Sequence, residues 1–165
     1  MSYQEKRTIT SISTSVLLLA AYIIYAFSPA RLASAGAEDL KALSITMLIF
    51  IGIGIVTSII IQIIFHILLS ISIAVKTKIQ DQECDEEDIE RSVNSEMVED
   101  ERDKIIELKS TRVGFIVASV GFFGALISQT LDYSPAVLLN ILFIAFFFGS
   151  IGEGIAQLIY YRKGL

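Results

Sequence analysis

Four long apolar runs constrain this chain more than any other feature of its sequence. They cover residues 9–27, 43–75, 113–131 and 136–161. Each run can supply the roughly 20 residues that a helix needs to cross a hydrocarbon core of about 30 Å. The runs are continuously apolar, whereas the strands of a membrane barrel alternate between polar and apolar side chains. Because a helix satisfies its own backbone hydrogen bonds in lipid, the sequence predicts an all-α integral membrane four-helix bundle.

We expect a single transmembrane domain over residues 1–165, with helices at about 8–28, 43–75, 96–131 and 136–161. The second helix would span about 50 Å at 1.5 Å per residue, so it must tilt, kink or project from the membrane. Residues 77–95 are expected to form an acidic cytoplasmic linker, because seven of the ten residues 81–90 are acidic. Ser95 is the expected N-cap of a cytoplasmic helical extension that runs into the third transmembrane helix.

The first run has an alternative interpretation as a secretory signal peptide. Lys6 and Arg7 precede it, and the sequence Ala-Ser-Ala at residues 33–35 resembles a signal-peptidase site. Ile9 and Ile12, however, lengthen the apolar span beyond a typical signal core. We therefore expect a retained transmembrane helix.

Basic residues are unevenly distributed among the segments outside the apolar runs. The N-terminus, the central loop and the C-terminus carry 11 of the 13 lysines and arginines, while the first loop carries only Arg31 and Lys41. Basic residues favour the cytoplasmic side of a membrane. We therefore expect a multi-pass protein with the central loop and both termini in the cytoplasm. The net charge of −5 argues against nucleic acid as a partner.

The two halves of the chain resemble each other weakly. The sequence IIQIIFH at residues 60–66 aligns with IAQLIYY at residues 155–161, and both halves contain a Ser-Pro turn, at Ser28 and Ser134. Two tandem helical hairpins related by an ancient duplication are one explanation. Chance similarity between apolar helices is the other, and the sequence leaves both open.

Glu153 is the only acidic residue within the fourth apolar run, and it lies between Gly152 and Gly154. A carboxylate inside a bilayer costs about 2–3 kcal/mol or more unless it is protonated, paired or turned toward protein or water. Spacing by four residues aligns it with the small side chains of Ala145 and Gly149, and such a stripe packs against another helix. The flanking glycines are expected to let a neighbouring backbone approach the carboxylate. Its expected hydrogen-bond partners are Gln62, His66 or Ser15.

A matching stripe runs along the second apolar run, and the first and third runs add hydroxyl groups. The members of the second-run stripe are Gly54, Ser58, Gln62, His66 and Ser70. All of these polar side chains belong to the expected cytoplasmic halves of the helices, so we expect a polar vestibule open to the cytoplasm. Its intramembrane candidate residues are Glu153, Gln157, Gln62, His66 and Ser15. Two interpretations remain, namely hydrogen bonds that fix the register of the helices and a proton- or cation-linked site at Glu153.

Enzymatic chemistry finds little support in the sequence. It contains no HExxH motif, no glycine-rich phosphate loop and no nucleophile elbow. The single cysteine, Cys84, excludes a CxxC zinc motif, and the single histidine excludes bis-histidine haem ligation within one chain. We therefore expect no enzyme activity, no cofactor and no metal site.

The segment from residue 99 to residue 115 resembles a group of uncharacterised small prokaryotic four-helix membrane proteins in which an Asp-Glu-Arg-Asp sequence precedes a transmembrane helix. The matching residues are Asp100, Glu101, Arg102, Asp103, Ile106, Glu107 and Arg112. The resemblance covers about a tenth of the chain. It implies a protein of the prokaryotic cytoplasmic membrane and no known activity.

The charged segment also suggests an interaction surface. Its candidate residues are Asp100, Glu101, Arg102 and Asp103, whose carboxylates could pair with basic residues of another subunit or of the N-terminus. The alternative is a solvated helix extension. Taken together, these features favour a non-enzymatic membrane protein that acts as an oligomeric binding or regulatory module, with the lipid bilayer, a second copy and a cytoplasmic protein as partners. The alternative function is a small proton- or cation-conducting channel or transporter that uses Glu153.

Overall fold

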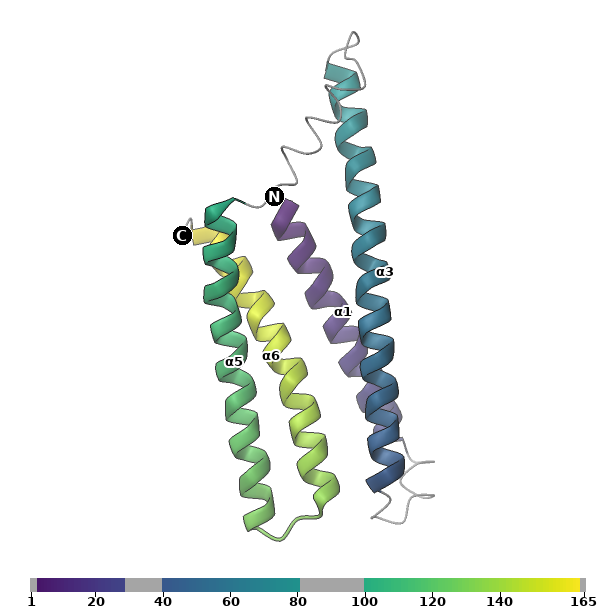
Figure 1. Ribbon diagram of the computed structural model, residues 1–165, viewed down its shortest axis with the longest axis vertical. Helices are drawn as coiled ribbons and strands as arrows, with labels where there is room; N and C mark the ends of the chain where they lie inside the picture. The colour runs from purple at the N-terminus through teal and green to yellow at the C-terminus, as the bar shows by residue number, and fades with distance from the viewer. Residues whose placement is uncertain (1–2, 29–39, 81–99, 164–165) are drawn as a thin grey trace.

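The computed structural model describes residues 3–28, 40–80 and 100–163 of this chain. Within these residues it contains the helices α1 (Tyr3–Ala26), α3 (Leu40–Gln80), α5 (Glu101–Thr130) and α6 (Pro135–Lys163). Each helix is long and apolar enough to span a membrane, and the helices pack as an all-α bundle (Figure 1). The chain is therefore a membrane protein with four candidate spans, which confirms the predicted fold class.

The helix boundaries differ from the predicted ones mainly at the charged ends. Helix α1 begins at Tyr3 instead of residue 8, and α3 continues to Gln80, so residues 77–80 belong to a helix and not to the linker. The prediction of Ser95 as an N-cap of the third membrane helix was wrong, because Asp100 caps α5. Ser95 itself and residues 81–95 of the linker lie outside the described residues.

Asp100 begins α5 through a reciprocal capping box. Its extended backbone places its Oδ1 2.7 Å from the amide nitrogen of Asp103, while the amide of Asp100 donates to Asp103 Oδ2 at 3.3 Å. The two bonds satisfy donors that the first turn of a helix leaves without partners. Two carboxylates in the first turn also complement the positive end of the helix dipole.

One end of the bundle, which we call the terminal end, contains the start of α1, the end of α3, the start of α5 and the end of α6 (Figure 1). The opposite end, which we call the hairpin end, contains the turn between α5 and α6. Helix α3 has 41 residues, corresponding to about 60 Å at 1.5 Å per residue. It projects past the other helices at the terminal end (Figure 1), which is one of the solutions expected for its excess length.

Helices α5 and α6 form the most extensively packed pair of the bundle. Their backbones approach closely at two glycines, because a Cβ atom at Gly114 would lie 2.9 Å from the carbonyl oxygen of Gly149, and one at Gly149 would lie 2.9 Å from that of Gly114. Farther toward the hairpin end, a Cβ at Gly121 would collide with Ala145. The small-residue stripe of α6 therefore packs against α5 within the same chain, and it is not available for contacts between subunits.

The remaining helices pack more loosely. Helix α1 lies mainly against α6, and α3 contacts α1 more than α6. None of the most apolar stretch of α3 is buried within the chain, whereas each of the other helices buries part of its own. The two halves of the chain thus differ in packing, since only the second half forms a close helical hairpin.

Candidate functional site

Glu153 is positioned by the close contact between α5 and α6. It lies one turn beyond Gly149, and its Oε1 accepts a hydrogen bond of 2.8 Å from the hydroxyl of Thr111 on α5. Its glycine neighbours face different helices: a Cβ at Gly152 would touch Val117 of α5 at 3.4 Å, and one at Gly154 would collide with Ile12 of α1. The glycines thus let side chains of both neighbouring helices approach on either side of the carboxylate.

Gln157 is positioned by a ladder of side-chain hydrogen bonds between α1 and α6. The hydroxyl of Thr8 donates to Gln157 Oε1 at 3.0 Å, and the Thr8 side chain is buried. The next rung, seven residues along both helices, joins the hydroxyls of Ser15 and Ser150 at 3.3 Å. A third rung, from the Tyr22 hydroxyl to Asn140 Oδ1, measures 2.6 Å. The rungs are seven residues apart on α1, and seven and then ten residues apart on α6, so they follow one seam between two antiparallel helices.

A cavity of about 120 Å³, which we call the acidic cavity, lies where the four helices meet near the terminal end. Its lining contains three carboxylates and one guanidinium, and every other lining group is polar or aromatic. The lining residues are Gln4, Arg7, Thr8, Ser11, Gln62, Asp103, Glu107, Glu153, Gln157 and Tyr161. Across the part of the chain that the structure describes, no three His, Cys, Asp or Glu side chains are grouped so that they could hold a metal ion.

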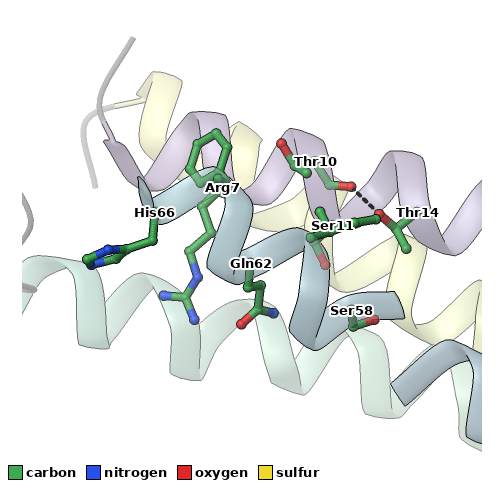
Figure 2. Close-up of a pocket in the computed structure, with 9 residues that line it drawn as sticks. Arg7, Thr10, Ser11, Thr14, Ser58, Gln62 and His66 are labelled. Carbon is green, nitrogen blue, oxygen red and sulfur yellow. Dashed lines mark hydrogen bonds between the residues drawn. The ribbon is translucent and has the colours of Figure 1, made fainter. Parts of the chain in front are cut away.

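A larger cavity of about 270 Å³, which we call the hydroxyl cavity, lies between α1 and α3 (Figure 2). Four hydroxyl side chains line it, and none of the lining residues that the structure describes is a carboxylate. The lining residues are Arg7, Thr10, Ser11, Thr14, Ser58, Ile61, Gln62, Phe65 and His66. Arg7, Ser11 and Gln62 line both cavities, so the two spaces adjoin one another. Figure 2 shows the Arg7 guanidinium and the Gln62 carboxamide extending in the same direction, whereas the His66 ring turns away from them.

Toward the hairpin end, an apolar cluster fills the space between α1, α3 and α6. Its buried members are Tyr22, Met47 and Phe143, and Phe50 packs against them. The Tyr22 ring lies with its centroid 4.3 Å from that of Phe143 and 5.4 Å from that of Phe50, the second pair in an edge-to-face arrangement. Along the bundle, the polar cavities near the terminal end are therefore followed by an aromatic cluster toward the hairpin end.

The structure brings most of the intramembrane candidates together. Glu153, Gln157 and Gln62 line the acidic cavity, and His66 lines the hydroxyl cavity. Ser15 lines neither of them, because it pairs with Ser150 on the α1–α6 seam. The expected partners of Glu153 were wrong, since Thr111 donates the hydrogen bond that its carboxylate accepts.

The four candidates for a cytoplasmic interaction surface have different environments. The side chains of Asp100 and Asp103 cap their own helix, and Asp103 also lines the acidic cavity. Glu101 and Arg102 are exposed on the first turn of α5. Asp100 is exposed as well, so three of the four candidates lie at the surface as the interaction hypothesis requires, and Asp103 is half-buried.

The sequence analysis missed two charged residues that line the acidic cavity, Arg7 and Glu107, and the hydrogen-bond partner of Glu153, Thr111. Arg7 was counted only as a topology signal, and Glu107 and Thr111 only as parts of a charged segment outside the membrane. Their position in the sequence could have indicated this role, because they lie one or two helical turns from an apolar run. A helix that continues beyond the membrane carries such residues on the same faces as its buried side chains.

Comparison with known proteins adds no family to this description. No protein-family model matches this sequence, and no curated protein and no solved structure is significantly similar to it. The group that the Asp-Glu-Arg-Asp segment resembles is therefore not identified by these comparisons. What can be said of the site rests on its own geometry.

Proposed function

We propose that this protein is a non-enzymatic integral membrane module that binds or regulates a partner through the terminal end of its bundle. One observation supports the proposal most directly. Two adjoining polar cavities lie at the terminal end, and a buried aromatic cluster lies toward the hairpin end. A polar space that stops at packed aromatic rings suits the binding of a ligand or partner better than conduction, which needs a continuous polar path.

The terminal end faces the cytoplasm in this proposal. It contains Lys6, Arg7, Arg162 and Lys163, and basic residues next to membrane spans favour the cytoplasmic side. The resemblance of the Asp-Glu-Arg-Asp segment to small prokaryotic membrane proteins supports placement in the prokaryotic cytoplasmic membrane. A cytoplasmic protein partner would then meet the exposed Glu101 and Arg102 at the start of α5.

The second candidate function is a small proton- or cation-conducting channel or transporter that uses Glu153. One observation favours it: the Glu153 carboxylate belongs to an apolar helix and yet lines the acidic cavity together with Asp103 and Glu107. Intramembrane carboxylates commonly mark ion and proton pathways. The aromatic cluster around Tyr22 opposes this function, because it packs across the direction that an ion would have to follow.

Flux measurements in liposomes separate the two functions. We expect wild-type protein and Glu153→Gln, reconstituted at equal density, to give no proton or monovalent cation flux above empty liposomes at either sign of the membrane voltage. Gramicidin added to the same liposomes verifies that the assay detects flux. A wild-type flux that disappears in Glu153→Gln would contradict the binding module and establish transport.

We further propose that the module forms a homo-oligomer through α3. The small residues of α5 and α6 are used within the chain, whereas none of the most apolar stretch of α3 is buried inside it. In membranes containing the Cys84→Ser protein, Ile59→Cys on α3 should form disulfide-linked dimers on oxidation. Phe115→Cys, on a still more exposed position of α5, is the control and should stay monomeric. Equal crosslinking at both positions, or none at Ile59→Cys, would contradict an α3 interface.

A further inference from the structure

The hydroxyl cavity has the chemistry of an anion site, although nothing in the proposed function requires one. Among the described residues that line it, only Arg7 carries a permanent charge, and none is a carboxylate. The acidic cavity next to it has the opposite character, because three carboxylates line it together with Arg7. The boundary between the two spaces thus separates an anion-accepting side from a cation-accepting side.

Several neutral donors of this cavity are available to a ligand. Thr10 and Thr14 donate to carbonyl oxygens of their own helix, at 3.0 Å and 2.9 Å. By contrast, the side chains of Ser11, Ser58 and Gln62 have no hydrogen-bond partner among the described residues. Two hydroxyls and a carboxamide that have no partner among the described residues line the same cavity as a guanidinium, and together they offer donors that suit the oxygens of a phosphate group.

The position of the cavity agrees with a ligand at the membrane interface. Arg7 lies two residues before the first apolar run, while Ile61 and Phe65 add apolar walls on α3. Next to these walls along α3, further long apolar side chains are exposed, such as Ile64 and Leu68. A basic pocket between membrane helices at the headgroup level, with apolar surface leading away from it, is suited to an anionic lipid.

We propose that the hydroxyl cavity binds a phosphate group, supplied either by the headgroup of an anionic phospholipid or by a soluble phosphate. Arg7 provides the charge and two parallel N–H donors, and Ser11, Ser58 and Gln62 provide the neutral donors. The exposed apolar surface of α3 favours the lipid as the source. The inference rests on the proposed binding role and names the class of ligand that the module holds.

Native mass spectrometry of the full-length protein in detergent tests the proposal with three probes: phosphatidylglycerol, phosphatidylcholine and inorganic phosphate. Phosphatidylglycerol and phosphatidylcholine share a phosphodiester, but the choline of the second carries a compensating positive charge. We expect one phosphatidylglycerol to be retained at concentrations at which phosphatidylcholine is not. Arg7→Gln and Ser58→Leu should each weaken this retention at least tenfold, the first by removing the charge and the second by filling the cavity.

Lys6→Gln is the matched control. Lys6 precedes Arg7 on the same helix and is exposed, but it lines neither cavity. The variant should therefore keep the retention of the wild type, and circular dichroism checks that all variants stay helical. Should Arg7→Gln fail to fold, Ser58→Leu decides, because it leaves every charge in place.

The outcomes distinguish a lipid from a soluble source of the phosphate. They also distinguish failure of the phosphate site from failure of the proposed binding module. Inorganic phosphate that binds in an Arg7- and Ser58-dependent way, without lipid retention, would support the site and assign it to a soluble ligand. Retention that falls equally in Lys6→Gln and Arg7→Gln, or that Ser58→Leu leaves unchanged, would overturn the site. A Glu153-dependent flux would refute the binding module on its own, without changing any of these measurements.

Discussion

Replacing Gly114 with leucine should separate α5 from α6 and lower the free energy of unfolding by about 1–3 kcal/mol or more. A Cβ atom at this position would lie 2.9 Å from the carbonyl oxygen of Gly149 and 3.0 Å from the Cβ of Glu153. The first contact involves the backbone of the facing helix, so no side-chain rotation relieves it. The midpoint of thermal unfolding of the purified protein, measured in one detergent, should fall accordingly.

Gly124→Leu is the control for the Gly114 substitution. Gly124 lies on the same helix, but nothing stands within 4 Å of the Cβ that a substitution would add. Leucine has a higher helix propensity than glycine by about 0.5–1 kcal/mol, so this variant should be as stable as the wild type or slightly more stable. Equal losses in both variants would contradict the close approach of the two backbones.

Tyr22→Ala should destabilise the protein by about 3–5 kcal/mol, which is the range for removing a large aromatic side chain from a packed core. Tyr22 is 0% exposed and packs against the rings of Phe143 and Phe50. Its hydroxyl also donates the 2.6 Å bond to Asn140, whose amide oxygen would lose this donor. Thermal unfolding in detergent measures the loss, and Tyr22→Phe isolates the part due to the hydroxyl, expected at about 1 kcal/mol.

Tyr25→Ala provides the comparison for the Tyr22 substitution. Tyr25 lies one turn later on α1 and touches Phe50, with ring centroids 5.8 Å apart, but it is 48% exposed. Its removal leaves no enclosed void, so the loss should stay well below that of Tyr22→Ala. A similar loss for the two alanine variants would mean that the aromatic cluster does not form the core of the hairpin end.

The membrane spans were predictable because an apolar run long enough to cross a bilayer has few other structures available to it. The helix ends were less predictable, since several residues near the start of α5 are good N-caps. Ser95 and Asp100 both qualify by type, and the reciprocal bonds between Asp100 and Asp103 distinguish them only in three dimensions. Polar residues such as Gln4 and Thr8 also continue α1 past the apolar run, where hydropathy gives no signal.

The sequence predicted most of the residues of the candidate site, but not which helices and side chains contact one another there. Four-residue spacing correctly places Glu153 on a face that packs against another helix, because the helical period fixes which side chains share a face. Which helix meets that face depends on the shapes of the surfaces. The approach of Gly114 to Gly149 brings Thr111 to Glu153, whereas Gln62 and His66 belong to the more loosely packed α3.

Arg7 lies on the wall of both cavities, and this shared position links their occupancies. An anion in the hydroxyl cavity would compete with Asp103, Glu107 and Glu153 for one guanidinium, and would leave those carboxylates with less positive charge nearby. A cation at the carboxylates would in turn leave more of the guanidinium to the anion. Linkage requires that each ligand change the affinity for the other by the same factor. A single arginine thereby provides a means of cooperative binding between oppositely charged ligands, without any movement of the helices.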